Sequence, residues 1–112
     1  MQTRSEFTQN LTAALLQQLS DPDLNGERLA RQLNMSRMHL HRHLQRYFQQ
    51  PAGKVINQTR LNRAHELVTG STLSINKIAS LVGFRDPSYF ARLFRQRYGC
   101  APRDLRREQE GS

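Results

Sequence analysis

The chain has 112 residues, enough for one compact domain or for two small lobes that share a helix. Only 37% of its residues are hydrophobic, which suits thin helical cores better than a large buried sheet and excludes a deep substrate cavity. The net charge is +8, and most of the basic residues are arginine, whose planar fork binds phosphates and guanine edges with two hydrogen bonds, so the composition favours a polyanionic partner.

The first part of the chain predicts three helices. An amphipathic helix is expected from Glu6 to Leu19, because apolar residues recur at every fourth position, namely Phe7, Leu11, Leu15 and Leu19. A short helix is expected from Glu27 to Leu33, with Asn25 as its cap and Asn34 in the turn that follows. Ser36 then caps a helix that runs to about Phe48.

The helix after Ser36 has two distinct faces. Its inner face consists of Leu40, His43, Leu44 and Tyr47. The side chains expected to project outward at helical spacing are Arg37, Met38, His41, Arg42 and Gln45. This outer face is the first candidate surface for recognition.

A long, partly buried helix is expected next, from Lys54 to about Thr69, and it would join the two lobes. Ser74 caps a short helix that ends near Val82, and Gly83 provides the turn, since glycine adopts positive φ without steric cost. Asp86 and Pro87 are a cap and a first helical position, which together form a strong signal for the start of a helix.

The helix that begins at Pro87 should bury a stripe made of Phe90, Leu93, Phe94 and Tyr98. Its outer face should carry Ser88, Ala91, Arg92 and Arg95. Gly99 ends this helix, and Pro102 opens a last short one. Residues 108–112 contain nothing to bury, so we expect a frayed tail.

One pattern occurs twice in the chain. Residues 29–49 can be aligned with residues 78–99 if a single residue is inserted at Arg85, and the apolar positions then match in type. Two helix-turn-helix units are therefore predicted, at about residues 26–48 and 74–98. An all-α fold with two helix-turn-helix subdomains joined by a long linker helix follows from this repeat.

Each repeat offers residues suited to the major groove of DNA. A recognition helix packs its inner stripe on the preceding helix and presents short or forked polar groups to the bases. In the first repeat, Arg42 can bind guanine, His41 can contact a base or a phosphate, Met38 can meet a thymine methyl, and Arg37 begins the helix. In the second repeat, the smaller Pro87, Ser88 and Ala91 allow close approach, and Arg92 is the main polar group.

Other polar residues are better suited to the phosphate backbone, which positions a protein without selecting a sequence. These candidate phosphate contacts are Ser36, Gln45, Arg46, Lys54, Arg95, Arg97 and Arg103.

The second repeat resembles the signature of the AraC/XylS family of bacterial transcription regulators. The resemblance spans roughly residues 24–107, and the residues that carry it are Ile78-Ala79, Val82-Gly83-Phe84, Asp86 to Phe90, Arg92, Phe94-Arg95, Tyr98-Gly99 and Pro102. It implies a DNA-binding domain whose two recognition helices enter successive major-groove segments. It also implies double-stranded DNA and RNA polymerase as partners, and an activator more often than a repressor.

The chain departs from the family after the first recognition helix. The family usually has a glycine and a later proline there, whereas this chain has Gln49 and Ala52. Residues 1–23 resemble the lead-in helix of domains that end response regulators or hybrid two-component sensors. The resemblance thus implies the output part of a longer protein, monomeric as an isolated domain although the parent protein can be dimeric.

The sequence also bears on functions other than DNA binding. His39 and His43 have the spacing of two metal ligands, but two ligands are too few, so we expect neither metal nor cofactor. No nucleophile and base are suitably spaced, so we expect no enzyme. A solvated arginine surface and a protein-interaction module that contacts RNA polymerase through Met38 or Ala91 remain alternatives. RNA binding is disfavoured because no exposed aromatic set for stacking bases is visible.

Cysteine content and hydropathy bear on the location of the protein. The single cysteine, Cys100, excludes an internal disulfide and a cysteine-based zinc site, and it fits a reducing compartment. No apolar run is long enough to span a bilayer, and Met1 is not followed by the apolar stretch of a signal peptide. We therefore expect a cytoplasmic, nucleoid-associated protein that does not enter a membrane.

Overall fold

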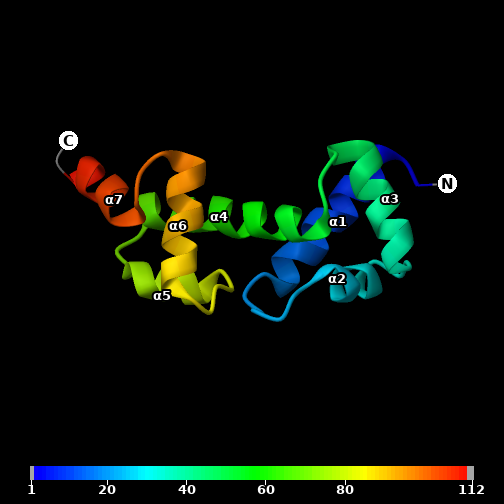
Figure 1. Cartoon of the computed structure of the whole chain (residues 1–112), viewed down its shortest axis with the longest axis horizontal. Helices are drawn as coiled ribbons and strands as arrows, with labels where there is room; N and C mark the ends of the chain where they lie inside the picture. Colours follow the sequence, from blue (N-terminus) through cyan, green and yellow to red (C-terminus); the bar gives the residue numbers. More distant parts are fainter. Residues whose placement is uncertain (1, 111–112) are drawn as a thin grey trace. The chain divides into compact units, whose positions relative to one another are not determined.

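The computed structural model describes residues 2–110, which form seven α-helices and no strands (Figure 1). The helices are α1 (Arg4–Gln18), α2 (Gly26–Gln32), α3 (Arg37–Phe48), α4 (Ala52–Gly70), α5 (Ile75–Leu81), α6 (Pro87–Tyr98) and α7 (Pro102–Glu110). The all-α prediction is confirmed. No helix within residues 2–110 combines the length and apolar character needed to cross a membrane.

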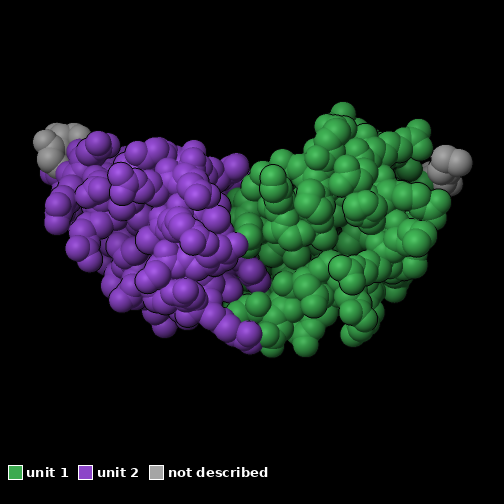
Figure 2. Space-filling model, in the orientation of Figure 1, with its two compact units in different colours: residues 1–59 green, residues 60–112 purple. Residues whose placement is uncertain are grey.

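The chain divides into two compact units, one ending at Thr59 and the other beginning at Arg60 (Figure 2). The boundary falls inside α4, so this helix contributes its first turns to one unit and its remaining turns to the other. Each unit has its own hydrophobic core. The predicted arrangement of two subdomains joined by a long helix agrees with this division.

The core of the first unit joins α1, α2, α3 and the start of α4. Phe7 of α1 is fully buried, and its ring centroid lies 5.0 Å from that of His43 and 5.8 Å from that of Tyr47. Buried side chains from the other helices complete the core, including Leu29, Leu40, Leu44 and Ile56. The helix that the sequence sets apart as a lead-in is thus part of the first unit's core.

The core of the second unit is built mainly of aromatic and branched side chains. The rings of Phe90 and Phe94 meet edge to face, with centroids 5.8 Å apart, and both side chains are fully buried. The helices α4 and α5 supply Leu61, Ala64, Val68, Ile78 and Ala79 to the same core. These contacts fix α6 against the second part of α4 by the burial of its apolar stripe.

The two helix-turn-helix turns have the same backbone hydrogen bonds. The amide of Met35 donates to the carbonyl of Ala30 at 3.0 Å, and the amide of Phe84 donates to that of Ala79 at 2.9 Å. The residues before them have positive φ, 57° for Asn34 and 99° for Gly83. The predicted turn positions are confirmed, and the repeat seen in the sequence is a repeat in structure.

All four predicted N-caps are also confirmed. The side chains of Asn25, Ser36, Ser74 and Asp86 each accept a hydrogen bond from an amide in the first turn of the helix that follows.

Helix ends shift by one or two residues from the predicted bounds. The tail differs more, because α7 includes residues 108–110, which were predicted to be frayed; they are exposed but helical, while residues 111 and 112 lie outside the described range.

The turn from α3 into α4 is formed without glycine. Gln49 ends α3 in the left-handed conformation with φ of 55°, and its amide donates to the carbonyl of Gln45. Pro51 then starts α4, since its carbonyl accepts from the amides of Lys54 and Val55. Gln49 therefore takes the role that Gly99 has at the end of α6, where φ is 80°.

Replacing Gln49 with glycine is expected to stabilise the first unit by about 0.5–1 kcal/mol. A side chain in the left-handed region costs more than the extra freedom that glycine adds to the unfolded chain. Urea unfolding of the variant would measure the change. Gln50→Gly is the control, because Gln50 lacks positive φ and should lose stability instead. A loss of stability in both variants would contradict the strain argument.

Arg106 of α7 joins α7 to the end of α4 and to the loop that follows α4. Its guanidinium donates hydrogen bonds to the backbone carbonyls of Leu67, Val68, Ser71 and Leu73. These carbonyls lie at the C-terminal end of α4 and in the following loop, where a helix leaves acceptors unpaired and favours a cation. Arg106 thereby anchors α7 and the α4–α5 loop to each other.

Arg106→Met is expected to lower the free energy of unfolding of the second unit by about 2 kcal/mol, because several carbonyls lose a charged donor. Arg106→Lys should restore little, since a point charge does not reproduce the planar fork. Thermal or urea unfolding checks both variants. The neighbouring Arg107 is exposed, so Arg107→Met serves as the control. Equal stability of the two methionine variants would contradict the role given to Arg106.

Candidate nucleic-acid interface

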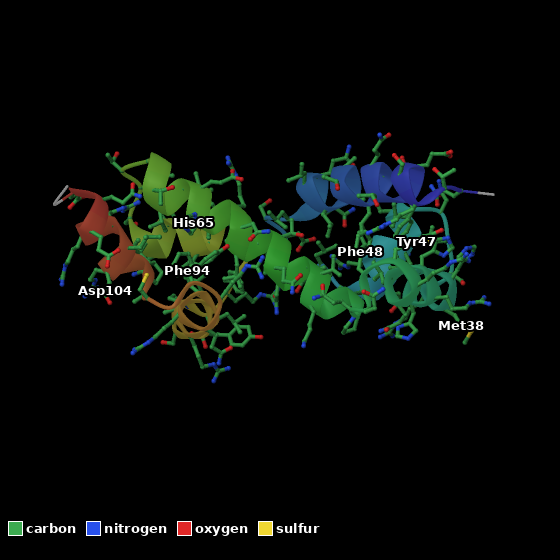
Figure 3. All side chains as sticks on the ribbon, turned by 90° about the horizontal axis from the view of Figure 1, so that it is seen from above. Met38, Tyr47, Phe48, His65, Phe94 and Asp104 are labelled. Atoms are coloured by element: carbon green, nitrogen blue, oxygen red, sulfur yellow. The ribbon has the colours of Figure 1, made fainter. Side chains whose placement is uncertain are left out.

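The outer face of α3 is exposed as predicted. All five side chains expected to project from it are exposed, namely Arg37, Met38, His41, Arg42 and Gln45. Met38, in the first turn, is 70% exposed and points away from α1 (Figure 3). The hydroxyl of Ser36 caps the helix by accepting from the amide of His39 at 3.0 Å. The apolar side chain of Met38 therefore lies beside Arg37 and Arg42, on a helix whose opposite face is buried in the core.

The outer face of α6 carries smaller side chains than that of α3, together with two arginines, Arg92 and Arg95. Pro87, Ser88 and Arg92 are exposed, but Ala91 is only half-exposed. Ala91 is less exposed than Ser88 and Arg92 because it follows Phe90 directly and borders the buried stripe. The guanidinium carbon of Arg92 lies 5.2 Å from the ring centroid of Tyr89.

The predicted phosphate-binding cations lie on several helices. Arg46 on α3, Lys54 on α4, Arg95 on α6 and Arg103 on α7 are all exposed. Arg46 also packs over the ring of Tyr47, with its guanidinium carbon 5.7 Å from the ring centroid. Such side chains keep their charge in solvent while their stems cover apolar surface.

Arg97 differs from the other cations. Its Nε and Nη2 donate to Oδ1 of Asn62 at 3.2 and 3.0 Å, and the hydroxyl of Tyr98 donates to the same oxygen at 2.8 Å. The end of α6 is thus held to α4 by one amide oxygen that accepts three hydrogen bonds. Arg97 has a structural contact that the sequence did not predict.

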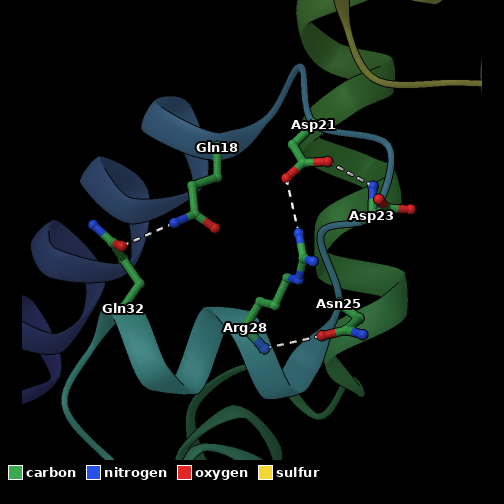
Figure 4. A network of polar contacts seen from close by, with 6 residues as sticks. All are labelled: Gln18, Asp21, Asp23, Asn25, Arg28 and Gln32. Atoms are coloured by element: carbon green, nitrogen blue, oxygen red, sulfur yellow. Dashed lines mark hydrogen bonds and ion pairs between the residues drawn. The ribbon is translucent and has the colours of Figure 1, made fainter.

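Some charge in the first unit is paired within the protein. Arg28 donates to Oδ2 of Asp21 at 3.0 Å, in a polar network between α1 and α2 (Figure 4). Beside it, Gln18 donates to Gln32, and Gln32 donates to Gln17, each at 2.8 Å. These residues line an open groove of about 470 Å³. The groove is lined by side-chain amides and by the ion pair between Arg28 and Asp21. Because its charge is paired with Asp21, Arg28 is not among the candidate DNA contacts.

Two of the three histidines of α3, His39 and His43, pack on one another. The ring centroids of His39 and His43 are 4.4 Å apart, and Nδ1 of His43 lies 3.0 Å from the carbonyl oxygen of His39. Within residues 2–110, no three His, Cys, Asp or Glu side chains converge as a metal site would require. The ring of His43 also lies 5.0 Å from that of Phe7, so His43 is part of the packing around Phe7.

A family model described as "Helix-turn-helix domain" matches residues 29–108. The chain is 32% identical over 102 residues to the HTH-type transcriptional activator RhaS of Escherichia coli (strain K12 / DH10B), covering 91% of this chain and 37% of RhaS. This chain belongs to the AraC-type helix-turn-helix family. It spans 37% of the length of that relative.

Solved structures share the AraC-type fold. The DNA-binding domain of AdpA, solved in complex with a target DNA, matches with a TM-score of 0.83 and 23% identity, covering 99% of this chain and 96% of that one. The C-terminal domain of AraT, a response regulator of Geobacillus stearothermophilus, matches with a TM-score of 0.79 and 27% identity, covering 90% of this chain and 83% of that one. The arrangement of helices is therefore that of AraC-type domains.

Two residues of this AraC-type domain were missed from the sequence. Tyr89 belongs to the family signature, and its position three residues before Arg92 puts the two side chains on one face of a helix. That spacing could have revealed the contact. Asn62 had no such signal, because its partners Arg97 and Tyr98 lie 35 and 36 residues further along the chain.

Proposed function

We propose that this AraC-type domain is a sequence-specific binder of double-stranded DNA and the output part of a transcription activator. The observation that carries the proposal is the structural repeat: α3 and α6 are both 12-residue helices with a side-chain N-cap, a buried inner stripe and an exposed outer face that carries arginine. A helix of this kind fits the major groove. The name of RhaS as an activator and the DNA in the AdpA structure support the same conclusion.

In this proposal, the two helices read bases in two segments of the major groove. Base contacts come from Arg37, Met38, His41 and Arg42 on α3 and from Pro87, Ser88, Ala91 and Arg92 on α6. Phosphate contacts come from Ser36, Gln45, Arg46, Lys54, Arg95 and Arg103. Arg97 is a weaker phosphate candidate, because two of its nitrogens already donate to Asn62.

Selection of bound duplexes from a random DNA pool tests the proposal. Two short sequence blocks about one helical turn apart are the expected result, because each recognition helix would read one block. A single block would assign base reading to one helix and phosphate contacts to the other. Binding that is equal on all selected and scrambled duplexes would overturn the proposal of sequence-specific recognition.

Salt dependence provides a second, quantitative check. If Arg46, Lys54, Arg95 and Arg103 each neutralise a phosphate, the logarithm of the binding constant should fall against that of salt concentration with a slope of about −3.6. Lys54→Ala should reduce this slope by about one unit and weaken binding similarly on all sequences. Arg107→Ala is a control, since Arg107 is exposed but has no assigned contact. An unchanged slope in Lys54→Ala would contradict its assignment.

A second candidate function is a contact with RNA polymerase by one of the helix-turn-helix units. The observation that favours it is the exposure of Met38, an apolar side chain that could serve in a protein interface as well as against a thymine methyl. Met38→Ser would separate the two roles. Reduced DNA affinity would support base contact, whereas normal DNA affinity with reduced transcription in a purified system would support the polymerase contact.

The proposed function also carries the expectations about the parent protein. A transcription regulator of this kind works on the chromosome, so we infer a cytoplasmic, nucleoid-associated location. The isolated domain is expected to be monomeric, with any dimer formed by the rest of the parent protein. Sedimentation of the isolated chain at several concentrations would test the monomer.

A further inference from the structure

The two recognition helices support their arginines differently. Arg92 of α6 lies over the ring of Tyr89, with the guanidinium carbon 5.2 Å from the ring centroid. The equivalent arginine of α3 is Arg42, and the residue three positions before it is His39. The ring of His39 packs instead on His43, at 4.4 Å between centroids.

The geometry of a helix explains why Tyr89 can hold Arg92. Side chains three residues apart share a face, and each leans toward the N-terminus of its helix, so residue 92 reaches back over residue 89. The N-terminal end of a recognition helix is the end that contacts base edges. The ring of Tyr89 therefore holds the guanidinium of Arg92 toward the end of α6 that would face the bases.

Tyr89 is itself fixed. Its ring meets that of Phe84 edge to face, with centroids 6.2 Å apart, and Phe84 is buried in the core of the second unit. Tyr89 remains 38% exposed, so its ring lies between the core and the surface. A chain of aromatic contacts thus extends from Phe90 through Phe84 and Tyr89 to Arg92.

We propose that Tyr89 is a positioning residue that sets the base preference of Arg92. The proposal rests on the proposed function of α6 as a base-reading helix. A guanidinium held in one orientation presents its two donors to one base edge, whereas a mobile one can reach phosphates and other bases. It follows that α6 discriminates at its arginine position more strongly than α3 does at Arg42.

The test measures binding of the intact chain to the duplex selected from the random pool and to its single-base variants. Arg92→Ala first identifies the base pair that depends on Arg92. Tyr89→Leu, which keeps apolar volume against Phe84, should then reduce discrimination at that base pair by about two- to fivefold, as expected for loss of an exposed cation–π contact. Tyr89→Phe keeps the ring and should retain the discrimination of the unaltered chain.

Coupling between the two residues separates positioning from a general structural role. In the Arg92→Ala background, Tyr89→Leu should cause no further change in base preference. Thermal unfolding of each variant would show whether the second unit remains folded.

Three results would overturn the proposal. In the first, Tyr89→Leu reduces affinity equally for all four base pairs. In the second, its effect persists without Arg92. In the third, Tyr89→Phe behaves like Tyr89→Leu, which would assign the role to the hydroxyl. Absence of any sequence preference in the unaltered chain would instead overturn the proposed function itself, so the two failures are distinguishable.

Discussion

Arg42→Ala and Arg92→Ala are each expected to weaken binding to the selected duplex by about 1–3 kcal/mol, and each should relax the base preference at one end of the site. An arginine that binds a guanine edge with two hydrogen bonds is the strongest kind of base contact available to either helix. Both side chains are exposed on faces whose opposite sides are buried, so their removal leaves the folded units intact. Titration of labelled duplexes with each single-base change measures the effect.

The matched control is Arg31→Ala on α2. Arg31 is exposed like the two candidates, but it lies 3.6 Å from Glu27 in an ion pair of the first unit and has no assigned DNA contact. Its replacement should leave base preference unchanged. If Arg42→Ala or Arg92→Ala weakens binding to the same extent on every sequence, that arginine contacts phosphate and does not read a base.

Phe94→Ala is expected to lower the free energy of unfolding of the second unit by about 3–5 kcal/mol. The side chain is fully buried, and its ring contacts those of Phe90, Tyr98 and His65, with centroids between 4.7 and 6.2 Å away. Figure 3 shows Phe94 of α6 and His65 of α4, the two helices that this ring joins. A cavity there removes the ring contact that joins the middle of α6 to α4. Urea unfolding would measure the change in stability. DNA footprinting would measure how well each of the two sequence blocks is protected from cleavage.

Because the two units have separate cores, the loss should be local. We expect the sequence block assigned to α6 to lose protection from cleavage while the block assigned to α3 keeps it. Leu81→Ala is the control, since Leu81 belongs to the same unit but is 42% exposed and should cost little. Equal loss of both blocks in Phe94→Ala would show that the units depend on one another for folding.

Much of the fold could be predicted because its signals are local. Helix caps depend on residues within one turn, so Ser36, Ser74 and Asp86 were identified from the sequence and are confirmed. The buried stripes of α3 and α6 follow from helical spacing in the same way. The internal repeat supports the predicted caps and the predicted buried stripes, because corresponding positions of the two units have the same role.

Apart from the Tyr89–Arg92 contact and the conformation of Gln49, the features that the sequence does not predict depend on tertiary contacts. The hydrogen bonds of Asn62 and the carbonyl contacts of Arg106 join segments more than thirty residues apart, and no sequence spacing encodes them. The conformation of Gln49 was also beyond prediction, because a glutamine rarely adopts positive φ and does so here at the end of α3. The base and phosphate contacts stay predictions.

The caps of the two recognition helices differ in charge. Ser36 caps α3 with a neutral hydroxyl, whereas Asp86 caps α6 with a carboxylate, and Pro87 removes an amide donor from the same end. The start of a helix ordinarily attracts phosphate. At α6 the carboxylate would repel phosphate, so that end would be left to the uncharged edges of the bases. The start of α3 would then contact phosphate as well as bases, whereas the start of α6 would contact base edges alone.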